Sequence, residues 1–165
     1  LLCSDGEINE DLLIDSFTPD ACPTLAGKPK MIFIQACRGR KLDAGYQLVV
    51  DGHGPGGSFP WSTSSSSALV PAKIPTHADF LVYRSTYAGH YSWRNSVNGS
   101  WFIQDLTGVL RRFAIQRSSS FDLMTLLTLV NREVAFKRQS RVPVDENDDD
   151  ERKEMNGKKE MPVFS

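Results

Sequence analysis

The stretch that decides the fold is MIFIQACRG, residues 31–39. Its first four residues, Met31 to Ile34, form a short apolar run that predicts a buried strand. Cys37 follows this strand at its carboxyl end. In open parallel α/β sheets, ligands and reacting groups gather outside the carboxyl ends of the strands. A thiol placed there is held by the strand and stays accessible, as a nucleophile must be.

Cys37 has two interpretations, because most free cysteines are small buried hydrophobes without a chemical role. The pentapeptide at residues 35–39 reads Q-A-C-R-G, and Q-A-C-[RQG]-G is the local signature of caspases. A second block, YSWRNS at 91–96 followed by GSWFIQ at 99–104, is similar to the substrate-groove segment of the caspase small subunit. The chain therefore resembles a caspase, and we favour the catalytic interpretation of Cys37.

The resemblance covers nearly the whole chain and is nearest to effector caspases of the insect type. KIPTHADFL at 73–81 and DLMTLLTLVN at 122–131 also carry it. It implies an α/β caspase-like fold of three layers, with a mainly parallel sheet flanked by helices and incomplete at both ends. It further implies three parts, which are the C-terminal part of the large subunit (1–42), a flexible intersubunit linker (43–74), and a small subunit truncated in its last strand (75–165).

Local patterns agree with this architecture. Helical spacing of apolar residues predicts a helix over 7–17, and two more helices should begin after the N-caps Ser100 and Asp122. An apolar run predicts a strand at 79–83. The Gly-, Pro- and Ser-rich residues before Ile74 bury too little to fold alone. Six of the seven residues at 145–151 are acidic, which predicts a solvated loop, followed by a strand within 161–164.

The composition limits the size of the core, the expected partners and the cellular compartment. A chain of 165 residues that is 40% hydrophobic can bury one core, and its net charge of -1 gives no reason to expect a nucleic-acid partner. No apolar run approaches the roughly 20 residues of a membrane span, so no membrane partner is expected either. Three cysteines without a C-x-x-C pair favour free thiols in the cytoplasm. The start at Leu1 without a methionine suggests a fragment. We expect no cofactor and no metal.

The general base is the missing part of the expected machinery. A cysteine protease needs a histidine to accept the thiol proton, and in caspases it lies about 50 residues before the cysteine. Only 36 residues precede Cys37, and none is a histidine. His53 lies in the linker, His77 at the entry to a strand and His90 beside the groove segment, so none is a good substitute. The resemblance places the base, and one of two oxyanion N–H donors, in a large-subunit segment that would be a partner.

The resemblance also suggests how the substrate aspartate is held. Arg94 resembles one of two arginines that bind its carboxylate, and the planar guanidinium suits that task. Gln35 resembles the amide that completes the pocket. The alternative for Arg94 is a surface ion pair. Arg38 is taken as structural, because its side chain need not face the pocket.

Aromatic residues would line the rest of the groove. By resemblance, Tyr91 and Trp93 form walls of the adjoining subsite, and Asn95 and Trp101 recognise an acidic residue further back on the substrate. The alternative for Trp101 is core packing, because it begins the apolar face of a helix.

Two functions of different classes follow. The first is a cysteine endopeptidase that cleaves protein substrates after aspartate, an effector caspase of apoptosis that works as a homodimer of processed heterodimers. The second is a catalytically inactive, truncated chain that binds and modulates an intact caspase. For maturation we expect cleavage after Asp51, in the linker and before Gly52, rather than after Asp43 near the sheet or Asp79 at a strand.

Overall fold

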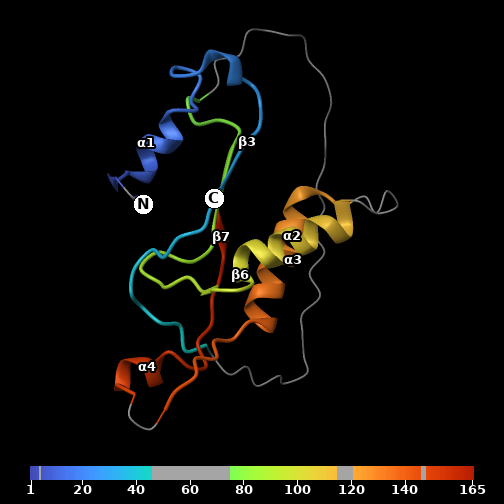
Figure 1. Cartoon of the computed structure of the whole chain (residues 1–165). Coiled ribbons are helices and arrows are strands. Elements are labelled where there is room, and N and C mark those ends of the chain that lie inside the picture. Colours follow the sequence, from blue (N-terminus) through green and yellow to red (C-terminus); the bar gives the residue numbers. More distant parts are fainter. Residues whose placement is uncertain (4, 46–74, 115–120, 146–147) are drawn as a thin grey trace, which may run out of the picture.

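The computed structural model describes residues 1–3, 5–45, 75–114, 121–145 and 148–165 (Figure 1). Its centre is a three-stranded sheet in the order β3 (Lys30–Ile34), β4 (Phe80–Arg84), β7 (Val163–Phe164). Strands β3 and β4 are parallel, with Met31 beside Leu81, whereas β7 is antiparallel to β4. The predicted α/β class and all three predicted strands are confirmed, and the sheet is mixed.

Helices cover both faces of this sheet. On one face α2 (Trp101–Ala114) packs against α3 (Leu123–Lys137), and on the other lies α1 (Glu10–Asp15) (Figure 1). Neighbouring residues of β4 show this division, because successive side chains of a strand point to opposite faces. Tyr83 belongs to the core with α2 and α3, while Arg84 forms an ion pair with Glu10 of α1. The expected three layers are therefore present.

The core lies between β4 and the pair α2–α3. Its buried members are Tyr83, Phe102, Leu106, Val109, Leu126, Leu127, Val130 and Val134. The Tyr83 hydroxyl donates to Asn131 Oδ1 at 2.7 Å and to the carbonyl of Leu127 at 3.2 Å. Burial raises the pKa of this phenol. The tyrosine thus ties the sheet to α3 by packing and by hydrogen bonds.

Side-chain caps set the helix starts. The Asp122 carboxylate accepts the N–H of Thr125 at 2.9 Å, and this bond lowers its pKa. Ser100 Oγ accepts the N–H of Ile103 at 3.3 Å, so both predicted N-caps are confirmed. The predicted helix over 7–17 is shorter in the structure, because Asn9 caps it and α1 begins only at the next residue.

Several short elements complete the chain. β1 (Leu2–Cys3) pairs with β2 (Gly6–Glu7), a 3₁₀ turn spans Pro23–Leu25, and the hairpin β5 (Arg94–Asn95)–β6 (Gly99–Ser100) leads into α2. None of the helices in the described ranges is long and apolar enough to cross a bilayer. Most of the predicted linker, 46–74, lies outside the described residues.

The predicted acidic loop is partly wrong, because α4 (Asp150–Glu154) begins inside it. Asp149 caps this helix by accepting the N–H of Arg152 at 2.9 Å. Asp150 and Glu151 lie in its first turn, where negative charge interacts favourably with the helix dipole. The like charges therefore start a helix instead of preventing one.

Candidate functional site

The segment carrying Cys37 is fixed on both sides by the chain that follows β4. Before the cysteine, the N–H of Ala36 donates to Ser85 Oγ at 3.3 Å, and the Ser85 hydroxyl donates to the Ala36 carbonyl at 3.1 Å. After it, the Gly89 N–H donates to the Arg38 carbonyl at 2.9 Å. Cys37 itself is exposed. The thiol is thus held in place and accessible, as its position after the strand predicts.

Gly39 meets a specific steric demand. Its φ of 154° is one that residues with a side chain rarely adopt, and a Cβ there would lie 2.3 Å from the carbonyl oxygen of Gly89. Only glycine allows the two chain segments to approach this closely. The glycine of the Q-A-C-R-G motif is therefore needed to seat the cysteine segment against its neighbour.

The sulfur of Cys37 contacts the main chain of Ser92. The Ser92 N–H donates to Sγ at 3.3 Å, and Sγ lies 3.5 Å from the Ser92 carbonyl oxygen. The imidazoles of the two described histidines bond elsewhere: His77 Nε2 to Asp15 at 2.8 Å, and His90 Nδ1 to the Ala88 carbonyl at 3.1 Å. His53 lies outside the described residues.

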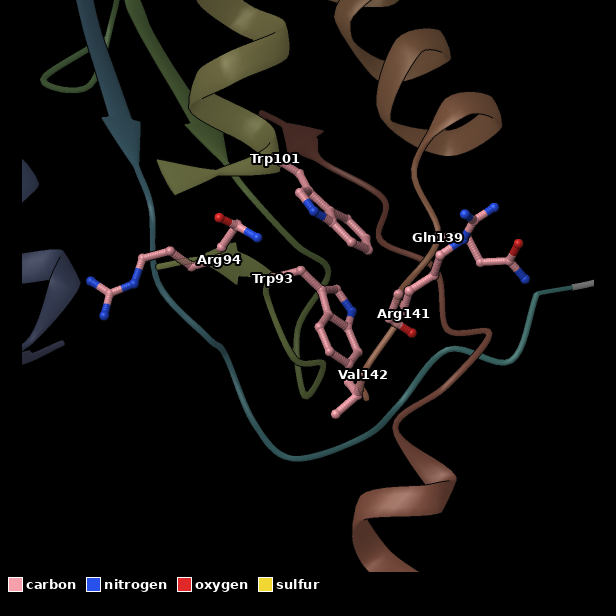
Figure 2. Close-up of a pocket in the computed structure, with 8 residues that line it drawn as sticks. Trp93, Arg94, Trp101, Gln139, Arg141 and Val142 are labelled. Carbon is pink, nitrogen blue, oxygen red and sulfur yellow. The ribbon is translucent and has the colours of Figure 1, made fainter. Parts of the chain in front are cut away.

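A cavity of about 280 Å³ is built on the β5–β6 hairpin (Figure 2). The Trp93 and Trp101 rings stack in it with centroids 5.6 Å apart, so Trp101 serves the cavity as well as the start of α2. Asn95 lines the same cavity, but its Oδ1 accepts the N–H groups of Val97 and Asn98 and so supports the hairpin turn. The remaining lining residues are Arg94, Gln139, Ser140, Arg141 and Val142.

A second cavity, of about 450 Å³, lies beside the thiol and shares Trp93 and Arg94 with the first. Arg94 is exposed, and its guanidinium points away from the two indoles toward the loop that follows β3 (Figure 2). The complete lining is Gln35, Ala36, Cys37, Tyr91, Ser92, Trp93 and Arg94. The structure thus brings the expected residues together in two adjoining cavities.

A buried carboxyl group lies beneath this second cavity. Glu160 is 2% exposed, and its Oε2 accepts the main-chain N–H of Trp93 at 2.6 Å. Its Oε1 accepts the hydroxyl of Ser92 at 3.4 Å, and Ser92 Oγ accepts Nε2 of Gln35 at 2.7 Å. Burial raises the pKa of Glu160 to about 7. The floor of the site is therefore a polar network and not a simple apolar packing.

The sequence profile of the family described as "Caspase domain" matches residues 1–165. This chain belongs to the caspase family. Among its relatives are Caspase-1 of Spodoptera frugiperda, 42% identical over 87% of this chain and 43% of that protein, and Caspase drICE of Drosophila melanogaster, 36% identical over 100% and 43%. Caspase-3 of Bos taurus is 39% identical over 83% of this chain and 44% of that protein.

The crystal structure of Caspase-1 from Spodoptera frugiperda matches this fold with a TM-score of 0.73 and 38% identity. The match covers 97% of this chain and 51% of the other. The chain thus spans less than half the length of the curated relatives named above. The expected family and caspase fold are confirmed, with insect caspases among the relatives.

Two residues of this site were not predicted from the sequence. Ser92 lies inside the segment YSWRNS at 91–96, so the motif could have predicted that it lies near Cys37. Glu160 follows Lys158 and Lys159, and no sequence signal marks it as buried. In the described part of the chain, Cys22 and Cys37 are free thiols, and no cluster of acidic, histidine and cysteine side chains could hold a metal.

Proposed function

We propose that this chain carries the nucleophile of a cysteine endopeptidase that cleaves protein substrates after aspartate. The observation that carries the proposal is that the exposed Cys37 and Arg94 line the same cavity. A guanidinium binds a carboxylate through paired hydrogen bonds, so an aspartate side chain held there would place its own peptide carbonyl near the sulfur. Gln35, from the same cavity, would supply a further amide contact.

The chemistry would proceed by acyl transfer. A histidine takes the proton of the Cys37 thiol, and the thiolate attacks the aspartate's own main-chain carbonyl carbon. The Cys37 N–H would donate to the developing oxyanion. The histidine then returns the proton to the leaving amine, and water hydrolyses the thioester. Tyr91, Trp93, Asn95 and Trp101 would hold the residues that precede the aspartate.

We place the base in a partner segment equivalent to the rest of the caspase large subunit. Two observations support a further segment against this chain. Strand β3 is at the edge of the described sheet, with Met31 50% and Phe33 39% exposed. The matched crystal structure is also about twice as long as the part that this chain covers. Edge strands with exposed apolar side chains are surfaces that proteins normally cover.

The finer assignments follow from the family. We propose an effector caspase of programmed cell death, cytoplasmic, acting as a homodimer of processed heterodimers with parts near 1–42, 43–74 and 75–165. Maturation would cleave after Asp51, which lies outside the described residues. The competing Asp43 is paired with the C-terminal segment, since its carbonyl accepts the N–H of Lys159 at 2.8 Å, and this disfavours its entry into a protease.

A second candidate is a catalytically silent chain that binds and modulates an intact caspase. The histidine geometry favours it, because His77 and His90 bond to groups other than the Cys37 sulfur. Both candidates predict that residues 1–165 alone do not cleave an Asp-Glu-Val-Asp reporter.

The experiment that separates them supplies a histidine-bearing large-subunit segment and measures reporter cleavage. The enzyme proposal expects turnover that is lost in Cys37→Ala. Absence of turnover, together with altered activity of an added intact caspase, would favour the silent chain. Turnover by residues 1–165 alone that needs Cys37 would show that the base lies within the chain.

A further inference from the structure

A chain of hydrogen bonds joins the cavity beside Cys37 to a buried carboxyl group. Gln35 Nε2 donates to Ser92 Oγ at 2.7 Å, and the Ser92 hydroxyl donates to Glu160 Oε1 at 3.4 Å. The other carboxyl oxygen is occupied by the N–H of Trp93 at 2.6 Å. Gln35 Oε1 is buried and has no hydrogen-bond partner within the described residues. One end of the network is thus unsatisfied.

The single hydrogen of the Ser92 hydroxyl fixes the direction of this chain. When Glu160 is ionised, both of its oxygens can only accept, so Ser92 must donate to it. Ser92 Oγ can then only accept from Gln35, whose amide must turn its nitrogen toward Ser92. A buried carbonyl without a donor is unfavourable, and here that carbonyl is Gln35 Oε1.

Protonation of Glu160 would reverse the two side-chain hydrogen bonds, Gln35–Ser92 and Ser92–Glu160, and leave the bond from the Trp93 N–H unchanged. A hydrogen on Oε1 would be donated to Ser92 Oγ, which frees the serine hydrogen for Gln35. The amide would then turn over, so that its oxygen accepts from Ser92 and its nitrogen, with both hydrogens unused, takes the position that the oxygen held. Amide oxygen and nitrogen have nearly the same shape, so this rotation requires no change in packing. In the reversed chain Gln35 Oε1 gains the partner that it lacks.

We propose that Glu160 is a positioning residue that controls, through Ser92, whether Gln35 presents an amide hydrogen or a carbonyl oxygen to a bound carboxylate. The inference rests on the proposed function, in which Gln35 contacts the substrate aspartate. A carboxylate accepts hydrogen bonds from an amide nitrogen and is repelled by an amide oxygen. Substrate binding is therefore linked to the uptake of a proton by Glu160.

The surroundings of Glu160 bring its pKa close to neutral pH. Burial raises its pKa to about 7, against the opposing effect of its bonds from Trp93 and Ser92. Asp105 of α2 raises it further, and Arg138 at the end of α3 lowers it. Asp43, His90 and Lys159 line cavities that Glu160 also lines. Cys37 contacts Ser92, which is hydrogen-bonded to Glu160. These are the other titratable or charged groups around Glu160. Aspartate affinity should be highest below about pH 7 and fall as the pH rises through it.

The first test measures KM for an aspartate peptide between about pH 6 and pH 8.5 in the protease assembled with its histidine-bearing segment. For the wild type, KM should rise by up to roughly tenfold per pH unit above pH 7, as for one linked proton. Glu160→Gln should give a flatter profile, because the glutamine nitrogen donates permanently to Ser92 while its oxygen accepts from Trp93. The control Glu154→Gln, on the exposed end of α4, should follow the wild type.

A Glu160→Gln profile identical to that of the wild type would overturn the proposal. If Glu160→Gln does not fold, Ser92→Ala serves instead, since it also separates Gln35 from Glu160 and should flatten the profile. If KM rises as steeply with pH in Ser92→Ala as in the wild type, the proposed coupling of Glu160 to Gln35 through Ser92 is equally contradicted.

A second test is independent of proteolysis. In the full chain, NMR of the Glu160 carboxyl carbon and of the Gln35 side-chain amide should show one shared titration near pH 7, and Ser92→Ala should remove it from Gln35. If no variant cleaves after aspartate but this shared titration is present, the proposed function is wrong and the coupling of Glu160 to Gln35 through Ser92 is supported. If the Gln35 amide signals do not change as Glu160 titrates, the proposed coupling of Glu160 to Gln35 through Ser92 is refuted.

Discussion

Gly39 and Gly89 lie so close that a Cβ on Gly39 would sit 2.3 Å from the carbonyl oxygen of Gly89. These two glycines let the segment after β3 run directly against the segment after β4. The contact fixes Arg38, whose carbonyl accepts the Gly89 N–H at 2.9 Å, and with it the neighbouring Cys37. The position of the Cys37 nucleophile therefore depends on the close backbone contact at Gly39, two residues further along the chain.

We expect Gly39→Ala to displace the cysteine segment. The clash is with backbone and cannot be relieved by a side-chain rotation, so it should cost about 2–4 kcal/mol in the free energy of unfolding and lower kcat/KM by more than tenfold. The control is Gly27→Ala, which also has a positive φ, of 64°, but meets nothing within 4 Å. Urea denaturation and reporter kinetics measure both effects. Equal effects of the two substitutions would show that φ matters and the close approach does not.

Glu160 should make the stability of the chain depend on pH. Its pKa rises from 4.5 in the unfolded chain to about 7, so between these values the folded state binds more protons than the unfolded one. Stability from this group is present at low pH and is lost as the pH rises through 7. Glu160→Gln removes the dependence and should gain about 2–3 kcal/mol relative to the wild type between pH 5 and pH 8.

Denaturant melts of both proteins at pH 5 and pH 8 provide the measurement for Glu160. Glu154→Gln is again the exposed control, for which no comparable gain is expected. A difference between wild type and Glu160→Gln that stays constant over this range would mean that Glu160 does not titrate there.

The Tyr83 hydroxyl should contribute to stability separately from its ring. Tyr83→Phe keeps the buried packing but leaves Asn131 Oδ1 and the Leu127 carbonyl without this donor. We expect a loss of about 1–3 kcal/mol in the free energy of unfolding. Tyr87→Phe is the matched control, because Tyr87 is 62% exposed and should change stability by less than about 0.5 kcal/mol. A neutral Tyr83→Phe would mean that these acceptors find other donors.

Local signals made the elements that carry the site predictable from the sequence. The apolar runs of β3 and β4 and the capping carboxylate of Asp122 act over a few residues, and all three are present. The acidic residues near 150 misled the prediction because like-charge repulsion was weighed without the N-cap Asp149. The site floor could not be predicted, since Glu160 and Trp93 are 67 positions apart and meet only in the folded chain.

Arg94 should prove irreplaceable by lysine. Arg94→Lys keeps the positive charge but loses the paired hydrogen bonds to a carboxylate, so kcat/KM for aspartate substrates should fall by at least about tenfold. Arg40→Lys, at an exposed position after the cysteine segment, is the control and should leave kinetics unchanged. Near-native kinetics of Arg94→Lys would place Arg94 outside the pocket.

The most direct test of the proposed protease is the residue preference at the cleaved bond, measured with the protease assembled from this chain and its histidine-bearing segment. Matched peptides with aspartate, asparagine or glutamate before the scissile bond are compared, and the products are identified by mass spectrometry. We expect efficient cleavage after aspartate alone, abolished in Cys37→Ala. Comparable cleavage of the asparagine peptide, or activity that survives in Cys37→Ala, would contradict it.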